Sequence, residues 1–184
     1  MKQDSQKKIT TAELTKISMC VALCCVASFI YFPLPFTPGM VTALTLAMSL
    51  SAYILPPKQT FLVILIYILL GAAGLPIFAG SGGVGKLFSP VGGFYFAWLL
   101  GYPILSFFKG EKPNLKRYAL ANIFLTMPIT YAGGLLSMYF LLDITLWQAA
   151  AMAVLPYIPG DVMKTLAAAF LGVKINSVES FKNS

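Results

Sequence analysis

Long apolar runs, separated by short polar or proline-rich breaks, organise almost the whole chain. A helix needs about 20 mostly apolar residues, with a range of about 17–25, to cross the hydrocarbon core of a bilayer. Six runs approach or reach that length, at residues 14–32, 39–55, 60–74, 92–108, 118–142 and 159–176. The pattern therefore predicts an all-α membrane protein with six spanning helices, in a single integral membrane domain that occupies residues 1–184.

The breaks between the runs give the expected ends of these helices. "FPLPFTPG" follows the first run, and its three prolines lack the backbone donors that a helix needs. The last apolar stretch, residues 146–173, is too long for one span and contains Pro156 and Pro159. We expect a short interfacial or re-entrant helix at about residues 147–155, and then a final span that starts near Pro159, since proline suits the first turn of a helix.

Composition and charge placement support a membrane location. Hydrophobic residues make up 58% of the chain and charged residues 10%, against about 25% charged in soluble domains. With six spans, only Lys86 and Lys164 of the 13 basic residues fall on the side opposite the termini. Because short cytoplasmic loops are enriched in Lys and Arg, we predict a multi-pass protein of the cell membrane with both termini cytoplasmic. The basic residues on the terminal side are Lys2, Lys7, Lys8, Lys16, Lys58, Lys109, Lys112, Lys116, Arg117, Lys174 and Lys182.

Several classes of function are disfavoured. The basic residues are scattered over separate loops, so attraction to anionic membrane lipid is expected and nucleic-acid binding is not. The chain contains no His, which removes His metal sites and His-activated nucleophiles. We predict no metal site, no cofactor and no catalytic residue.

A glycine-rich loop imitates two nucleotide-binding motifs. "GSGGVG", residues 80–85, fits G-x-G-x-x-G but lacks the strand and helix that give this fingerprint its meaning. "GSGGVGKL" is one residue short of a P-loop, and Leu87 stands where a hydroxyl should bind Mg²⁺. The remaining interpretations are a flexible loop, or a loop whose backbone must approach a ligand closely.

The most informative polar residues lie in "YIPGDVMKTL", where Asp161 and Lys164 are three residues apart and share one helix face. Ionisable residues at membrane depth normally face the bundle interior or a wet cavity. Three alternatives follow from the residues alone: a structural ion pair, a ligand pocket, or a proton-coupled or catalytic carboxylate. The last has thin support, because there is no second acid or obvious nucleophile nearby.

Other polar and aromatic residues leave alternatives open. Asn122, Thr126 and Thr130 form one stripe, which could line a cavity or bond a neighbouring helix. Aromatic residues near the predicted helix ends are more typical of an interfacial belt than of pocket walls. They include Tyr31, Phe94, Tyr95 and Tyr157.

Three stretches together resemble a known family. "FTPGMVTALTLAM", "GAAGLPIFAGSGGVGKLFSPVGGFYFAW" and "YIPGDVMKTLAAAF" resemble signature regions of BioY, the biotin-binding substrate-capture (S) component of energy-coupling factor (ECF) transporters. The resemblance covers nearly the whole chain. It implies a compact six-helix bundle with a pocket that opens outward, and high-affinity capture of biotin.

The resemblance also implies roles for individual residues. Asp161 would accept hydrogen bonds from the ureido N–H groups of biotin, and Lys164 would hold the valerate carboxylate. Ser81, with Gly80 and Gly82 beside it, would meet the ureido ring. Tyr95 stands where some relatives carry Arg, and we include it among the ligand-binding residues.

Partners are implied as well. S components dock on a membrane coupling protein that carries two cytoplasmic ATPases, reorient in the bilayer and release the vitamin inside. Ser18 and Ala22 match the small residues of the docking helix, although packing within the S component is an equal alternative. Leu44 replaces a Gln found in many members, so a different small carboxylate vitamin is an alternative ligand, and an intramembrane enzyme that uses Asp161 is a third possibility.

Overall fold

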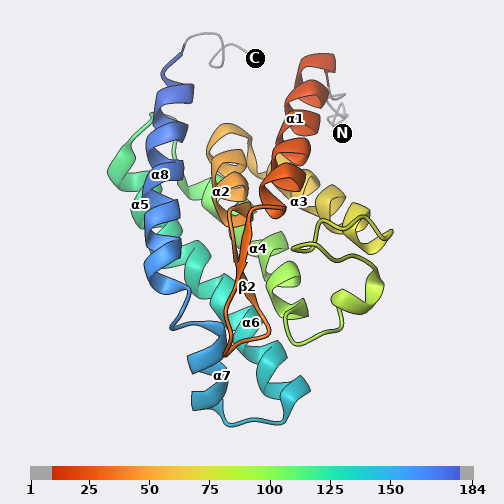
Figure 1. Cartoon of the computed structure of the whole chain (residues 1–184). Helices are drawn as coiled ribbons and strands as arrows, with labels where there is room; N and C mark the ends of the chain where they lie inside the picture. The colour runs from red at the N-terminus through yellow and green to blue at the C-terminus, as the bar shows by residue number, and fades with distance from the viewer. Residues whose placement is uncertain (1–9, 179–184) are drawn as a thin grey trace, which may run out of the picture.

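The computed structural model describes residues 10–178 as a mainly helical bundle with one short hairpin (Figure 1). Four of the predicted cytoplasmic lysines, Lys2, Lys7, Lys8 and Lys182, lie outside the described residues. The α-helices of the described part are α1 Thr11–Ser28, α2 Leu44–Ile54, α3 Pro57–Ala72, α4 Gly92–Phe108, α5 Leu115–Ala121, α6 Met127–Leu142, α7 Leu146–Ala153 and α8 Ile158–Asn176. The other elements are the strands β1 Tyr31–Pro33 and β2 Met40–Thr42, the 3₁₀ turn η1 Val84–Lys86 and the π-helical segment η2 Asn122–Thr126.

The helices follow the apolar runs closely. Helix α4 begins and ends at the predicted residues 92 and 108, and α8 starts one residue before the predicted 159 and ends at the predicted 176. Helix α7 occupies most of the range expected for the short helix before the last span. That these helices cross a bilayer, and that α7 lies in its interface, stays a prediction.

The hairpin corrects the bounds of two predicted spans. The first span was expected to reach residue 32, but α1 ends at Ser28 and Tyr31–Pro33 form β1. Residues 39–43 were expected to open the second helix, but Met40–Thr42 pair antiparallel with Tyr31–Pro33, and α2 starts only at Leu44. The prolines of "FPLPFTPG" hold the chain extended, and an extended segment can pair with its neighbour. Pro33 sits at the end of β1, where a missing donor is tolerated. The fold is therefore mostly helical, and not all-α as predicted.

Helices α5 and α6 run through η2 as one helical segment, Leu115–Leu142. At Asn122–Thr126 the helix is π-helical, so its backbone hydrogen bonds span five residues and not four. Such a π-helical turn within an α-helix often marks a functional site. By length and composition, this segment and Thr11–Ser28 are the two described helices able to cross a membrane, while α2, α3 and α4 are apolar but shorter.

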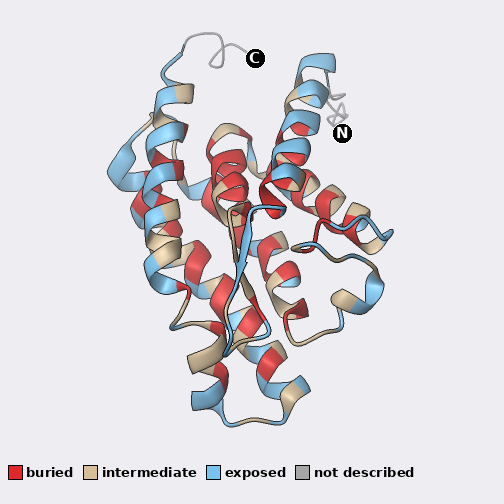
Figure 2. Cartoon of the chain, in the orientation of Figure 1, coloured by how far each residue is buried: buried red, intermediate tan, exposed pale blue. Residues whose placement is uncertain are grey.

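Figure 2 shows which parts of the chain are buried and which are exposed, and the exposed residues include many large apolar side chains. Large apolar side chains such as Phe107, Phe124 and Phe140 are exposed by 71%, 69% and 74%. Tyr53, Tyr67, Ser51 and several threonines are buried in the interior. Apolar groups can face the exterior without cost only where the surroundings are apolar, so this arrangement fits a protein surrounded by lipid tails.

Helix α4 packs against α2, α3 and α6, and α8 packs against α2. The α4–α6 contact depends on small residues, because a Cβ atom on Gly93 would lie 2.0 Å from the carbonyl oxygen of Gly133. The start of α1 and the end of α8 lie at one end of the molecule, while α7 and the hairpin tip lie toward the other (Figure 1). The elements near that second end enclose the pocket described next.

Candidate functional site

A pocket lies between the hairpin, the loop that precedes α4, and helices α2, α3, α4, α6 and α8. Its empty space, counted together with the open solvent at its mouth, is about 710 Å³. Most of the lining is apolar or aromatic. The charged residues in the lining are Lys86, Asp161 and Lys164.

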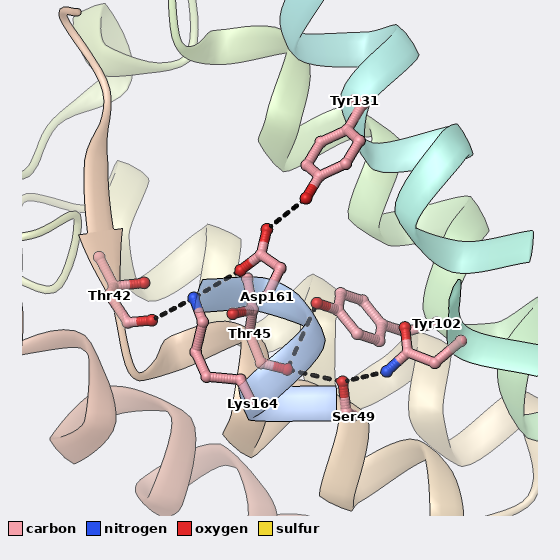
Figure 3. A network of polar contacts seen from close by, with 8 residues as sticks. Thr42, Thr45, Ser49, Tyr102, Tyr131, Asp161 and Lys164 are labelled. Carbon is pink, nitrogen blue, oxygen red and sulfur yellow. Dashed lines mark hydrogen bonds and ion pairs between the residues drawn. The ribbon is translucent and has the colours of Figure 1, made fainter. Parts of the chain in front are cut away.

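Asp161 and Lys164 form an ion pair inside this pocket (Figure 3). Both come from the first turns of α8, and the distance from Lys164 Nζ to Asp161 Oδ1 is 2.5 Å. Their side chains are only 14% and 17% exposed, respectively. Lys164 Nζ also donates to the carbonyl oxygen of Thr42 at 3.0 Å, so the pair links α8 to the end of the hairpin.

Tyr131 of α6 engages the second oxygen of the carboxylate. Its hydroxyl donates to Asp161 Oδ2 at 2.9 Å (Figure 3). Because Oδ1 contacts Lys164 and Oδ2 contacts Tyr131, the carboxylate is held in one orientation by two different elements. Charge-assisted hydrogen bonds of this kind are stronger than neutral ones. The spacing of Asp161 and Lys164 predicted their proximity, whereas nothing in the sequence indicated Tyr131.

A small polar chamber continues inward from the ion pair. Asp161, Lys164, Thr45, Thr130 and Tyr131 line both this chamber and the main pocket. Ser49, Tyr102, Asn122, Thr126 and Thr165 line the chamber alone.

The polar stripe Asn122, Thr126 and Thr130 both bonds neighbouring helices and lines a cavity, the two alternatives that its spacing left open. Asn122 Nδ2 donates to Ser49 Oγ at 2.8 Å, and Thr126 Oγ1 donates to the carbonyl oxygen of Gly101 at 3.3 Å. These two residues bond neighbouring helices and also border the chamber. Thr130 lines the cavity instead.

Three buried polar atoms in the described part of the chain lack a hydrogen-bond partner within the protein: Thr45 Oγ1, Trp98 Nε1 and Thr130 Oγ1. All three residues line the main pocket. Trp98 is 8% exposed and Thr130 is 7% exposed. Unpartnered buried polar groups are rare and costly in native proteins, so their concentration in one pocket indicates a site that receives polar atoms of a ligand.

Aromatic side chains form the wall between these polar groups. Tyr95 contacts Phe78 and Trp98, with ring centroids 4.4 Å and 5.0 Å apart, and Tyr67 packs against Phe78. Tyr95 and Tyr157 are 6% and 7% exposed. The prediction of a membrane-interface belt is therefore wrong for these two tyrosines, because both line the pocket, as Phe94 does. Tyr31, in contrast, is 41% exposed.

The glycine-rich loop borders the pocket through residues other than those predicted to bind. Ala79 lines the pocket, whereas Gly80, Ser81 and Gly82 do not. The Ser81 hydroxyl donates to the carbonyl oxygen of Phe78 at 2.7 Å. Gly80 has φ +78°, and a Cβ atom there would lie 2.6 Å from the Tyr31 hydroxyl. In this structure the three residues shape the loop, and a direct contact with a ligand stays a prediction.

The predicted docking residues lie away from the pocket. Ser18 and Ala22 are both exposed on α1, on a face that also exposes Met19, Leu23 and Val26. Their side chains therefore do not fill the interior of this chain. The face is apolar with small residues on it.

The chain matches the model described as "BioY family" over residues 1–180. The chain belongs to the BioY family. It is 36% identical to a probable biotin transporter BioY of Bacillus subtilis (strain 168) over 158 residues, covering 82% of each chain. It is 31% identical to a biotin transporter BioY of Thermotoga maritima over 168 residues, covering 91% of this chain and 97% of that one.

A solved structure shares the fold. It is described as the S-component for biotin from an ECF-type ABC transporter, and it superposes with a TM-score of 0.83 at 20% identity over 90% of each chain. BioY proteins are membrane transporters, so the chain is membrane-embedded. The resemblance seen in the three sequence stretches is confirmed.

Proposed function

We propose that the protein captures biotin at the outer side of a cell membrane, as the substrate-binding S component of an ECF-type ABC transporter. The relatives are named biotin transporters, and the structural neighbour is a biotin S-component. The observation that carries the proposal is the pocket: an ion pair and three unpartnered buried polar atoms surround an aromatic cavity. Biotin, with a neutral ureido head, an apolar middle and a carboxylate, suits such a cavity.

Each part of the pocket has a task in this proposal. Asp161 accepts hydrogen bonds from the ureido N–H groups, and Lys164 supplies a positive charge beside it. The aromatic wall covers the bicyclic ring and the alkyl chain, with a gain of about 0.8 kcal/mol for each buried CH₂. Ser81, Gly80, Gly82 and Tyr95 belong to the predicted ligand-binding set, and among these four Tyr95 lines the pocket.

The proposed topology has six spans with both termini in the cytoplasm. Residues 10–178 contain nine Lys and Arg residues, and in the six-span scheme all but Lys86 and Lys164 lie on the same side of the membrane as the termini. Helix α7 then lies at the outer membrane surface, where its exposed Trp147 suits the interface.

In this proposal the protein works with partners. The exposed Ser18 and Ala22 face of α1 allows close approach of a helix of a coupling protein, and that protein carries two cytoplasmic ATPases. Docking, reorientation in the bilayer and release of biotin inside complete the cycle. The S component itself needs no cofactor.

Two other functions have weaker support. A different carboxylate vitamin remains a candidate ligand, because Leu44 lines the pocket in place of a polar residue and Ser81 bonds its own loop. An intramembrane enzyme is not supported: the family is one of non-enzymatic transporters, and Asp161 is the only acid that lines the described pocket.

Calorimetric titration of the detergent-purified chain with biotin tests the proposal. We expect saturable binding at one site per chain. Mass spectrometry of small molecules retained by protein purified from rich medium provides an independent check. Absence of biotin binding, together with recovery of another carboxylate, would replace biotin with that ligand and leave the transport class intact.

A further inference from the structure

Lys86 is a second cationic side chain in the pocket, and it comes from a different wall than the ion pair. It is the last residue of η1, in the loop between α3 and α4, and it is half-buried. The turn fixes its backbone, since Lys86 N donates to the carbonyl oxygen of Gly83 at 3.1 Å and Ser89 Oγ donates to the carbonyl oxygen of Lys86 at 2.7 Å. The sequence pattern identified Lys86 only as a basic residue outside the cytoplasmic loops.

The ammonium group of Lys86 has no hydrogen bond or ion pair within the described residues. Lys164, in contrast, already has two partners, the Asp161 carboxylate and the Thr42 carbonyl. The charges of Asp161 and Lys164 balance each other. Lys86 therefore leaves the pocket with one uncompensated positive charge, which favours an anionic group on the ligand.

The two charged regions occupy different parts of the cavity. Asp161 and Lys164 line both the main pocket and the inner polar chamber, whereas Lys86 lines the main pocket alone. The unpartnered hydroxyls of Thr45 and Thr130 lie with the ion pair at the junction of the two spaces. A balanced charge pair with two free hydroxyls suits a neutral head that both donates and accepts hydrogen bonds.

We propose that Lys86 is the residue that selects the carboxylate of the ligand, which binds with its neutral head against Asp161 and Lys164 and its acid end toward Lys86. This inference rests on the proposed function. It assigns the ligand's carboxylate to Lys86, whereas the family resemblance implies that Lys164 holds it. An ammonium group binds a carboxylate as a point charge. The arrangement makes Lys86 a specificity-determining residue for small monocarboxylates.

Calorimetry with biotin and biotinamide, which differ only in having a carboxylate or a neutral carboxamide at the acid end, tests the inference. The wild-type chain should bind biotin more tightly than biotinamide. Lys86→Met should weaken biotin by about 10- to 100-fold, the usual range for losing a charged hydrogen-bond partner, and leave biotinamide nearly unchanged. Lys164→Met should weaken the binding of both ligands, because it leaves the Asp161 carboxylate without its counter-ion. Lys112→Met, on the exposed loop between α4 and α5, is the matched control and should change neither.

Three further results complete the test. Lys86→Arg, which keeps the charge, should retain the preference for the acid, and Lys86→Gln should lose it as Lys86→Met does. Equal weakening of both ligands by the neutral Lys86 variants, or unchanged biotin affinity, would overturn the inference. A selective loss of the acid preference in Lys164→Met would return the carboxylate to Lys164. Failure of the wild-type chain to bind either ligand would instead contradict the proposed function.

Discussion

Two half-buried lysines, Lys164 near the pocket and Lys109 near the opposite end of the bundle, show how similar burial can serve different purposes. Lys109 follows α4 and donates to the carbonyl oxygens of Ala52 and Leu55 at 3.0 Å and 2.6 Å. These carbonyls belong to the last turn of α2 and its cap. Lys164 instead pairs with an acid that itself borders a cavity.

The polar groups around the two lysines also differ in whether they have hydrogen-bond partners within the protein. Around Lys109 the polar groups are bonded within the protein: Ser106 donates to the carbonyl oxygen of Leu55, and Asn176 donates to the Tyr118 hydroxyl. Around Lys164, two threonine hydroxyls have no partner within the protein. A fully bonded polar cluster stabilises the fold, whereas free polar groups in a pocket are available to a ligand. The contrast separates a structural region from a binding region.

The largest expected effect is on ligand binding at the pocket end. Asp161→Asn should weaken biotin by at least about 100-fold, because the variant loses the charged acceptor and leaves Lys164 buried without its counter-ion. Calorimetry of the purified variant measures the change. Asp143→Asn, at the exposed end of α6, is the control and should bind as the wild type does. Tight biotin binding by Asp161→Asn would contradict the assignment of Asp161 as a ligand-binding residue.

The next effect is on stability at the opposite end. Lys109→Met should lower the free energy of unfolding by about 1–3 kcal/mol, because buried carbonyls at the end of α2 lose a charged donor. Biotin affinity of the folded variant should not change. Thermal denaturation in detergent measures the loss, with Lys112→Met as the exposed control. A stable variant with weakened biotin binding would reverse the assignment of the two regions.

The stability difference between the wild type and Lys109→Met should depend on pH. Burial lowers the pKa of Lys109 from its ordinary value of 10.5 to about 8, so between these values the unfolded chain binds more protons than the folded one. Stability contributed by this group therefore rises as the pH increases from about 8 toward 10.5. The melting temperature of the wild type relative to Lys109→Met should rise over that interval, and a fall would contradict the pKa shift.

The smallest effect concerns the orientation of the acid. Tyr131→Phe removes the hydroxyl that donates to Asp161 Oδ2 and keeps the ring. We expect biotin affinity to fall about 5- to 10-fold, corresponding to about 1 kcal/mol for one hydrogen bond. Tyr139→Phe, on the same helix with a more exposed ring, is the matched control. Equal affinities for Tyr131→Phe and the wild type would show that the acid is oriented without this bond.

Much of the helical arrangement could be predicted from the sequence, because an apolar run of limited length is a local signal. The bounds of α4 and α8 followed from the breaks beside them. The hairpin could not be predicted in the same way, since pairing of Tyr31–Pro33 with Met40–Thr42 depends on two separate segments. Valine and threonine before an apolar run fit the start of a helix as well as the end of a strand.

At the site, the sequence by itself determined that an acid and a base share one face at the start of the last helix, because three residues of helical spacing place them there. Only the tertiary structure decided which groups join them. Tyr131, Thr42 and Lys86 come from other elements, and aromatic residues near helix ends became pocket walls. Contacts between segments far apart in the chain depend on which helix faces meet, and the spacing of residues within one helix does not say which neighbour its face will contact.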